Sequence, residues 1–248
     1  MPFGEPVRLK KHLGQHLLVS GGVIKKIVEY AQIEAGDKVV EIGPGTGNLT
    51  KALLETPLSE LHLVEIDKQM VEKLKQLQDP RLHIHHADAT SFDFCLLGKD
   101  LKVLGNLPYN VASLILERIV FCKECINFGL FMVQKEVAQK LIEGPSWLGS
   151  FIQTFYRIEY LMSVPPKFFV PPPKVTSALI RLTREEKAKI EDLEDYKGFL
   201  LKLYSQGRKM LKNKLDVSIL ERAGIDPKRR TEELSLEEII RLYHEYHP

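Results

Sequence analysis

Membrane and export signals are missing from this chain of 248 residues. No apolar run approaches the ~20 residues of a membrane-spanning helix, so we expect no membrane association. The N-terminus carries charge without an apolar core followed by small residues, so we expect no secretory signal. Cysteine is also scarce. Three cysteines cannot all pair within one chain, which favours a reducing compartment and a cytoplasmic location.

Metal-binding patterns are incomplete. Cys122-Lys-Glu-Cys125 has the spacing of a metal or redox site, but no second pair of this kind and no nearby histidine pair completes it. The segment 82–88 contains three histidines that also lack a partner ligand set. We therefore expect no metal centre, and zinc or redox use of the cysteine pair stays a minor alternative.

A glycine-rich turn is the most informative local pattern. Lys38–Ile42 is a short apolar run that predicts a buried strand, and 48–55 has helical spacing. Between them glycine recurs at positions 43, 45 and 47, where it lets the backbone pass close to a ligand. The dinucleotide fingerprint needs a glycine where Asn48 stands, which disfavours a nicotinamide dehydrogenase. With Glu41, the spacing resembles the first motif of the S-adenosylmethionine (SAM) methyltransferases.

A second strand points to a ligand that contains a nucleoside. The segment 60–67 is an apolar run that ends in carboxylates, and Glu65 lies 22 positions after Gly43. A carboxylate at this strand end can accept hydrogen bonds from both ribose hydroxyls. Ile66 can pack on an adenine face, and Asp88, after the next strand, can accept a hydrogen bond from the adenine amino group.

Strand-like and helical segments alternate over about 180 residues. We predict further strands at 82–88, 101–105, 126–133, 150–163 and 176–182, and a helix that Ser20 caps. This alternation predicts an α/β fold with a doubly wound, mostly parallel sheet, which binds ligands at the carboxyl ends of its strands. The apolar content of 44% and the charged content of 27% fit a globular protein with a full core.

The pattern becomes purely helical near the C-terminus. We predict helices at 196–205, 208–215, 217–223 and 232–246, and divide the chain into domains of residues 1–184 and 185–248. Residues 196–230 carry ten Lys and Arg against three Asp and Glu, in a chain whose net charge is +2. Such a basic segment suggests attraction to phosphates, although it can also be a solvated face. Its candidate RNA-binding residues are Arg208, Lys209, Lys212, Lys214, Lys228, Arg229 and Arg230.

Asn106-Leu-Pro-Tyr109 follows a predicted strand and suits the chemistry of an aromatic amine. The amino nitrogen of adenine is a poor nucleophile because its lone pair is delocalised into the ring. The Asn106 side-chain oxygen and the Leu107 carbonyl can accept its two N–H bonds, so that the lone pair points at a sulfonium methyl. Pro108 stiffens the turn, and Tyr109 can stack on the base. The alternative is that Asn106 only caps the following helix.

Together these motifs resemble the ribosomal RNA adenine dimethyltransferase family. They are most similar to the KsgA branch, which acts on the small subunit and is related to the Erm antibiotic-resistance methyltransferases. The resemblance covers nearly the whole chain, with further matches at positions 13–15, 134–136, 169–178, 208–213 and 224–227. The sequence departs from the usual family pattern at Leu13, where Phe is common, at His16, where Asn is common, and at Thr176, where Asp is frequent.

The resemblance implies a Rossmann-like SAM-dependent methyltransferase domain with a small all-helical C-terminal domain. It implies transfer of two methyl groups to N6 of each of two adjacent adenosines near the 3′ end of small-subunit (16S) rRNA. A monomer acting on a small ribosomal subunit precursor is expected. The implied cofactor contacts are Gln15, Leu17, Gly43, Gly45, Glu65, Ile66, Asp88, Ala89 and Asn106. The implied base contacts are Asn106, Leu107, Pro108 and Tyr109, with Phe169 stacking on the other face.

Two other functions stay open. An Erm-like enzyme acting on large-subunit rRNA would share these motifs, although the basic segment and the match at 224–227 look more like the small-subunit branch. A non-catalytic RNA-binding factor in ribosome assembly would keep the fold, but the intact motif at 106–109 argues against it.

Overall fold

The computed structural model describes residues 14–247, so Leu13 lies outside the described part. The chain forms two compact units. The sheet unit comprises the described residues up to Lys135 together with Glu159–Thr183, and the helical unit comprises Glu136–Ile158 with the residues from Arg184 onward. The predicted domains of residues 1–184 and 185–248 stay a prediction. The compact helical unit differs from the predicted C-terminal domain because it also contains residues 136–158.

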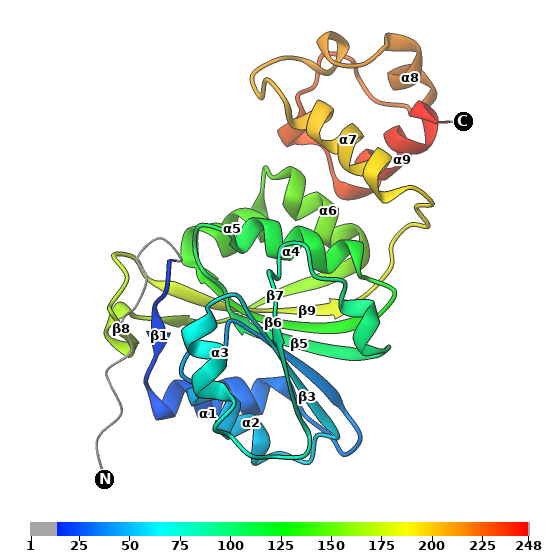
Figure 1. Ribbon diagram of the computed structural model, residues 1–248. Coiled ribbons are helices and arrows are strands. Elements are labelled where there is room, and N and C mark those ends of the chain that lie inside the picture. The colour runs from blue at the N-terminus through cyan, green and yellow to red at the C-terminus, as the bar shows by residue number, and fades with distance from the viewer. Residues whose placement is uncertain (1–13, 248) are drawn as a thin grey trace. The chain divides into compact units, whose positions relative to one another are not determined.

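A seven-stranded sheet with the order β4-β3-β2-β5-β6-β9-β7 forms the centre of the fold (Figure 1). β2 pairs in parallel with β3 and β5, β3 with β4, and β5 with β6, whereas β9 runs antiparallel to β6. This confirms the mostly parallel, Rossmann-like sheet. The strands are β2 Lys38–Ile42, β3 Glu60–Glu65, β4 Leu82–His86, β5 Leu101–Asn106, β6 Ile126–Gln134, β7 Tyr156–Val164 and β9 Ser177–Arg184.

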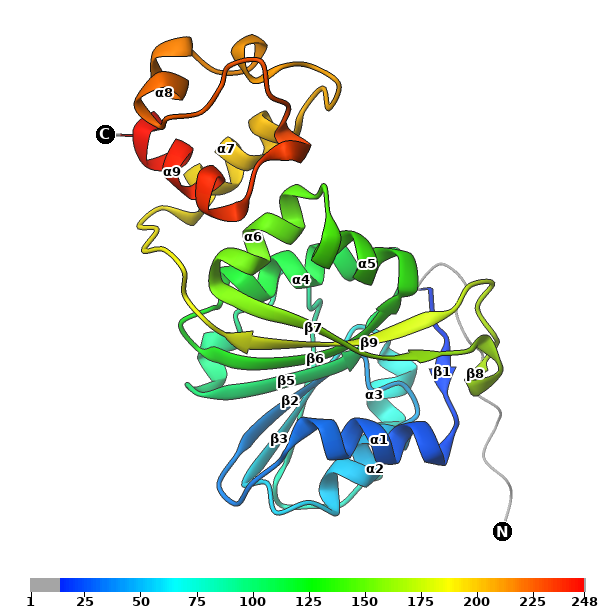
Figure 2. The ribbon, with the colours of Figure 1, turned by 180° about the vertical axis from the view of Figure 1, so that it is seen from behind.

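Helices cover both faces of this sheet. In Figures 1 and 2, α1 (Gly21–Ala31), α2 (Asn48–Leu54) and α3 (Lys68–Leu74) lie on one face and α4 (Ala112–Phe121) on the other. The Ser20 side chain accepts a hydrogen bond from the Val23 amide and caps α1, as predicted. The buried side chains of α1 and α2 join those of the strands in one apolar core, which holds the strand ends in place.

A short two-stranded ladder joins segments from the beginning and the end of the sequence of the sheet unit. β1 (Leu17–Leu18) pairs antiparallel with β8 (Phe169–Val170), and the two strands lie side by side in Figures 1 and 2. The Val19 amide extends the ladder by donating to the Phe168 carbonyl, in the short helix η3 (Pro166–Phe168), at 2.9 Å. The ladder therefore places the segment around Leu17 beside residues 165–173, the proline-rich segment.

The helical unit corrects two predictions. Its helices are α5 Lys135–Glu143, α6 Trp147–Phe155, α7 Leu193–Tyr204, α8 Val217–Arg222 and α9 Leu236–Tyr246, with short turns η4 Leu211–Asn213 and η5 Thr231–Glu233. The predicted strand at 150–163 is wrong up to residue 155, because Ser146 caps α6 and the apolar residues of α6 follow helical spacing. The predicted helix at 208–215 is wrong as well. Amides in this segment donate to the Pro227 and Arg229 carbonyls instead, which leaves only η4.

Cysteine pairing also differs from expectation. Cys95, in the short helix η2 (Phe94–Leu97), forms a disulfide with Cys125, and Cys122 is a free, buried thiol. The cysteines therefore do not support the reducing compartment that their odd number suggested. Within residues 14–247, no helix combines the length and the apolar character needed to cross a membrane.

A buried hydroxyl pair stabilises the helical unit. Tyr196 in α7 and Thr154 in α6 share a hydrogen bond of 2.8 Å, and both side chains are fully buried. The Tyr196 ring also lies against Phe151 and Phe155. Burial raises the pKa of Tyr196, so its hydroxyl stays neutral at physiological pH.

Thr154→Val should therefore destabilise the protein by about 1–3 kcal/mol, because it leaves the Tyr196 hydroxyl buried without this partner. Chemical denaturation measures the free energy of unfolding. The matched control is the double variant Thr154→Val with Tyr196→Phe, which removes both groups and should cost less than the sum of the two single changes. Strictly additive costs would show that the pair contributes nothing.

Candidate functional site

A cavity of about 160 Å³ opens at the carboxyl ends of β2, β3 and β5. The register of the parallel strands brings Ile42, Val64 and Gly105 side by side, so the loops that follow these strands surround one space. The cavity is lined by the predicted cofactor and base contacts Gln15, Leu17, Gly43, Gly45, Glu65, Ile66, Asp88, Ala89, Asn106, Leu107, Pro108 and Tyr109. The structure thus brings these residues together, while their individual binding roles stay predictions.

The glycine turn forms one wall of the cavity. Gly43 and Gly45 adopt φ angles of 62° and 58°, in the left-handed region that favours glycine. A Cβ atom at Gly45 would also lie 2.6 Å from Leu17 Cδ2, so the Leu17 side chain would have to shift. The left-handed backbone is therefore the main reason for glycine at position 45.

Glu65 holds this turn from the neighbouring strand. Its Oε1 accepts the Gly45 amide at 3.1 Å, and its Oε2 accepts the Asp67 amide at 3.0 Å. Burial raises the pKa of Glu65, and these backbone hydrogen bonds oppose the shift. The Ile66 amide is a third donor to this carboxylate. A carboxylate has about four lone-pair positions, so the group can still accept a hydrogen bond from a ligand. Ile66 beside it is 48% exposed, although it is a large apolar residue that lines the cavity.

Glu41 of the glycine motif is also buried, with 3% of its surface exposed. Thr50 in α2 donates its hydroxyl to Glu41 Oε1. Burial is the main cause that raises the pKa of Glu41 to about 8, with a smaller contribution from the charge of Glu65. At neutral pH Glu41 is therefore a neutral acid and adds no negative charge to the cavity. The Thr50 partner was not predicted, since nothing in the sequence shows that α2 packs over Glu41.

Asn106 is oriented by the N-terminal segment. Its Nδ2 donates to the His16 carbonyl at 2.7 Å, which leaves Oδ1 as an acceptor at the cavity. Asn106 is the last residue of β5, whereas the N-cap of α4 is Val111. The alternative that Asn106 merely caps the following helix is therefore wrong.

The rest of the segment from Gly14 to Val19 is tied to the cavity wall by contacts that the sequence did not predict. Gln15 Nε2 donates to Asp67 Oδ2 at 3.3 Å, and Asn48 Nδ2 donates to the Leu18 carbonyl at 3.0 Å. His16 Nδ1 lies 2.8 Å from the Pro171 carbonyl, and the His16 ring is tilted against the ring of Tyr109. His16, a departure from the usual family pattern, thus links three parts of the site.

The segment Leu107 to Tyr109 is equally fixed. The Leu107 amide donates to the Met132 carbonyl in β6 at 3.1 Å, which sets the direction of the adjoining peptide groups. The Tyr109 hydroxyl is hydrogen-bonded to Ser177 Oγ in β9. Burial raises the pKa of Tyr109, so the ring carries a neutral phenol. Ser177 was not predicted as part of the site, because it lies 68 positions from Tyr109.

Of the predicted contacts Phe169 and Asp88, only Asp88 lines the cavity. Phe169 is 2% exposed, belongs to the apolar core and is absent from the lining, so its stacking on a base stays a prediction. Asp88 is exposed and lines the cavity, with Oδ1 accepting both the amide and the hydroxyl of Thr90. These two bonds orient the Asp88 carboxylate on the cavity wall.

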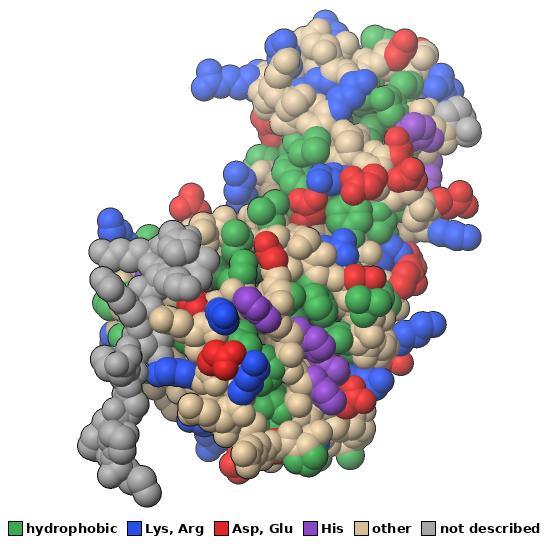
Figure 3. Space-filling view, in the orientation of Figure 1, with side chains coloured by type: hydrophobic (Ala, Val, Ile, Leu, Met, Phe, Trp, Pro, Cys, Tyr) green, Lys and Arg blue, Asp and Glu red, His purple; other side chains and the backbone are tan. Residues whose placement is uncertain are grey.

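The predicted RNA-binding residues fall into two groups. Figure 3 shows Lys and Arg side chains over the C-terminal helical part, where Arg208, Lys209, Lys212, Lys228 and Arg230 are exposed. Lys214 instead donates to the Leu203 carbonyl and to Thr231 Oγ1, and burial lowers its pKa. Arg229 is ion-paired with Glu238. Lys214 and Arg229 therefore have structural partners within the helical unit.

Glu41 generates a pH prediction. Its carboxyl is protonated in the folded protein up to about pH 8 but ionises near its ordinary pKa of 4.5 in the unfolded chain. The folded state thus holds a proton that the unfolded state has lost, and the contribution of Glu41 to stability falls as pH rises from about 4.5 to about 8.

Glu41→Gln should remove this dependence because a neutral amide has no proton to lose. The difference in free energy of unfolding between wild type and variant should change by at most about 1.4 kcal/mol per pH unit in this window. Urea titrations at pH 5, 6, 7 and 8 measure it. Parallel stability curves for the two proteins would show that Glu41 is already ionised when folded.

Comparisons with known proteins show the family of the chain. The model of the family described as ribosomal RNA adenine dimethylase matches residues 7–247. The ribosomal RNA small subunit methyltransferase A of Persephonella marina is 47% identical, with 96% of this chain and 94% of the relative covered. The protein of the same name from a Sulfurihydrogenibium species is 42% identical, with 96% of each covered.

Solved structures support the fold. A dimethyladenosine transferase from Plasmodium falciparum superposes with a TM-score of 0.81 at 23% identity, covering 93% of this chain and 97% of the other. The 23S rRNA methyltransferase ErmE superposes with a TM-score of 0.72 at 23% identity, covering 92% of this chain and 98% of the other. From the extent of the family match and the identity to its members, the chain belongs to the ribosomal RNA adenine dimethylase family.

Proposed function

We propose that this protein dimethylates N6 of two adjacent adenosines near the 3′ end of small-subunit rRNA during ribosome biogenesis. The observation that carries the proposal is Asn106, whose amide is fixed by the His16 carbonyl so that its oxygen remains an acceptor beside the cavity. The relatives named small subunit methyltransferase A, at 47% and 42% identity, favour this substrate over the large-subunit rRNA of ErmE.

The cavity fits SAM, the methyl donor of this enzyme class. The glycine turn offers backbone without side chains, and the Glu65 carboxylate lines the cavity as an acceptor for the ribose hydroxyls. Ile66 presents an apolar surface for the adenine ring, and Asp88 also lines the cavity. We assign the remaining cofactor contacts to Gln15, Leu17, Gly43, Gly45, Ala89 and Asn106.

When bound, SAM supplies an electrophilic sulfonium methyl group. The chain has to make the adenine amine nucleophilic, which it can do by accepting both N–H bonds at Asn106 Oδ1 and at the Leu107 carbonyl. These bonds favour a pyramidal nitrogen whose lone pair no longer conjugates with the ring. Tyr109, held by Ser177, can support the base from one face. Asn106 is neutral, so it does not place a full negative charge against the sulfonium.

The substrate also needs a surface that holds RNA. Phosphate contacts position a nucleic acid without reading its sequence, and the exposed cations of the helical unit suit that role. We assign it to Arg208, Lys209, Lys212, Lys228 and Arg230, and give Lys214 and Arg229 a structural part. The protein is proposed to act as a monomer in the cytoplasm, where small ribosomal subunit precursors are assembled.

Asn106→Ala should lower turnover by about 10²-fold or more, because the amine loses an acceptor that it needs in the transition state. The measurement is the initial rate of labelled methyl transfer from SAM to unmethylated small ribosomal subunits, with nucleoside analysis of the product. Binding of the subunits, measured separately, should change little. Methylation at a rate near that of wild type would refute the orienting role of Asn106.

Reversing the charges of Arg208 and Lys209 to Glu should weaken binding of small ribosomal subunits. The slope of log affinity against log salt should become shallower by up to about 0.7–0.9 for each phosphate group that the variant no longer binds. The matched control is Lys25→Glu with Lys26→Glu, an equal change of charge at two exposed positions of α1. Equal affinity and salt slope in both double variants would show that the segment around Arg208 is only a solvated face.

A further inference from the structure

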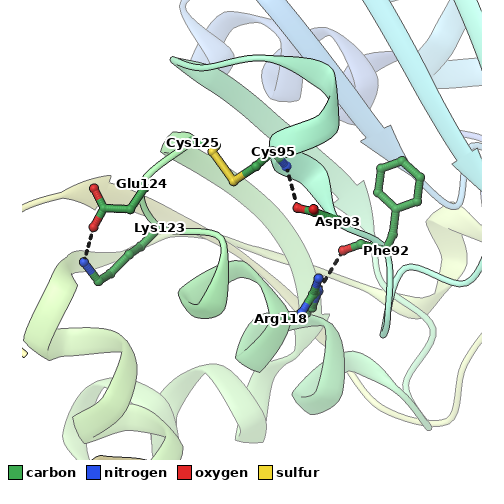
Figure 4. The surroundings of a disulfide bond; sticks show 7 residues. All are labelled: Phe92, Asp93, Cys95, Arg118, Lys123, Glu124 and Cys125. Carbon is green, nitrogen blue, oxygen red and sulfur yellow. Dashed lines mark hydrogen bonds and ion pairs between the residues drawn. A yellow bond between two sulfur atoms is a disulfide. The ribbon is translucent and has the colours of Figure 1, made fainter. Parts of the chain in front are cut away.

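Three sulfur atoms and a carboxylate gather at one corner of the sheet unit, away from the cavity lining. Asp93 Oδ, Cys95 Sγ and Cys122 Sγ all lie within 4.8 Å of one another. Cys125 joins this group through its bond to Cys95 (Figure 4). The sequence pattern indicated only the pair Cys122 and Cys125. The fold adds two more candidate ligands, Asp93 and Cys95, from a segment about 30 positions earlier.

The group is built from two segments with firm local structure. Asp93 caps η2 by accepting the Cys95 amide at 3.1 Å. Cys122 is the C-cap of α4, and the Cys125 amide donates to the Cys122 carbonyl at 3.0 Å in a tight turn. Each of these contacts fixes the side chains of its own segment, and the disulfide joins the two segments.

A cation and a hydrogen-bonded loop lie beside this group of side chains. Arg118 is held at this corner because its Nε donates to the Phe92 carbonyl at 2.7 Å (Figure 4). This hydrogen bond joins α4, whose C-cap is Cys122, to the segment that carries Asp93 and Cys95.

We propose that Asp93, Cys95, Cys122 and Cys125 form a redox-gated site for a divalent cation that prefers thiolate ligands, with Zn²⁺ as the natural occupant. In the oxidised protein the bond between Cys95 and Cys125 uses two of the four ligands and keeps the site closed. A dithiol reductant supplies two electrons and two protons, becomes a disulfide itself, and leaves three free thiols. One Zn²⁺ then binds three thiolates and the Asp93 carboxylate, and three protons leave.

The geometry requires only a local change. Tetrahedral zinc with Zn–S bonds of about 2.3 Å places its sulfur ligands about 3.8 Å apart. Cys95 and Cys125 must therefore separate from their bonded distance, while the atoms of Asp93, Cys95 and Cys122 already lie within 4.8 Å. Asp93 is exposed and Cys122 and Cys125 are buried, so a cation enters from the Asp93 side. Thiolate ligands select Zn²⁺ over Mg²⁺ or Ca²⁺, and the complex would carry a net charge of about −2 beside Arg118.

The test is a titration with Co²⁺, whose thiolate complexes absorb light where Zn²⁺ complexes do not. Full-length protein is reduced with dithiothreitol, freed of it without oxygen and titrated with CoCl₂, in parallel with oxidised protein. We expect one Co²⁺ per reduced chain, with thiolate charge-transfer absorption and tetrahedral bands that ZnCl₂ abolishes, and none in the oxidised protein. Thiol counting should give one free thiol before reduction and three after it.

Cys122→Ser is the matched variant, because it leaves the disulfide able to form but removes one thiolate. After reduction it should bind Co²⁺ at least about 10-fold more weakly than wild type. Urea unfolding of the oxidised variant checks that it is folded. Equal Co²⁺ binding by reduced wild type and reduced Cys122→Ser would overturn the site. Three free thiols in protein purified without reductant would overturn the redox gate.

Discussion

The hydrogen bond from the Gly45 amide to the buried Glu65 carboxylate is the contact on which the rest of the site depends. It fixes the loop after β2 to the end of β3, in a turn whose left-handed φ angle at Gly45 favours glycine. A hydrogen bond to a charged group is worth about 1.5–3 kcal/mol, and its removal would leave the amide buried without this partner. The same carboxylate is thus both a support for the turn and a candidate ligand of the ribose.

Charge is distributed unevenly around that contact. Glu41 and Glu65 lie close enough for the charge of Glu65 to raise the pKa of Glu41, and burial keeps Glu41 neutral near pH 7. The cavity therefore has one buried carboxylate that accepts backbone amides and one carboxylic acid that forms a hydrogen bond with Thr50. Asn106 adds an uncharged hydrogen-bond acceptor to the cavity. A cavity of this kind can bind a cationic cofactor without a surplus of negative charge.

Most strands of the fold could be predicted, because short apolar runs between glycine and proline residues mark buried parallel strands. α6 was missed since Phe151, Ile152 and Phe155 satisfy a strand and a helix almost equally over a short window. The segment 208–215 was predicted as a helix because its charges recur at helical spacing. Its amides at Leu211 and Lys212 instead donate to the Arg229 and Pro227 carbonyls, outside the window in which helical spacing is read. Local pattern carries no information about such partners.

The site residues, too, were predictable where a local motif marks them and not where they depend on packing between segments. Motif residues at strand ends were predictable, because parallel strands place their carboxyl ends at one edge of the sheet. The supports from His16, Thr50 and Ser177 were not, since each depends on which segment packs over the strand end. Phe169 shows the limit of a motif: the sequence places it in the family pattern, while the structure buries its ring in the core. Cys95 could not be assigned a partner from spacing alone.

The ladder between β1 and β8 has a consequence for the order of events during synthesis. Its strands are more than 150 positions apart along the chain, so the ladder cannot form before both have been synthesised. A nascent chain that has emerged only as far as β6 contains the glycine turn, Glu65 and Asn106 but no strand to hold the segment around His16. The part of the cavity wall that orients Asn106 is thus completed only after the proline-rich segment has left the ribosome.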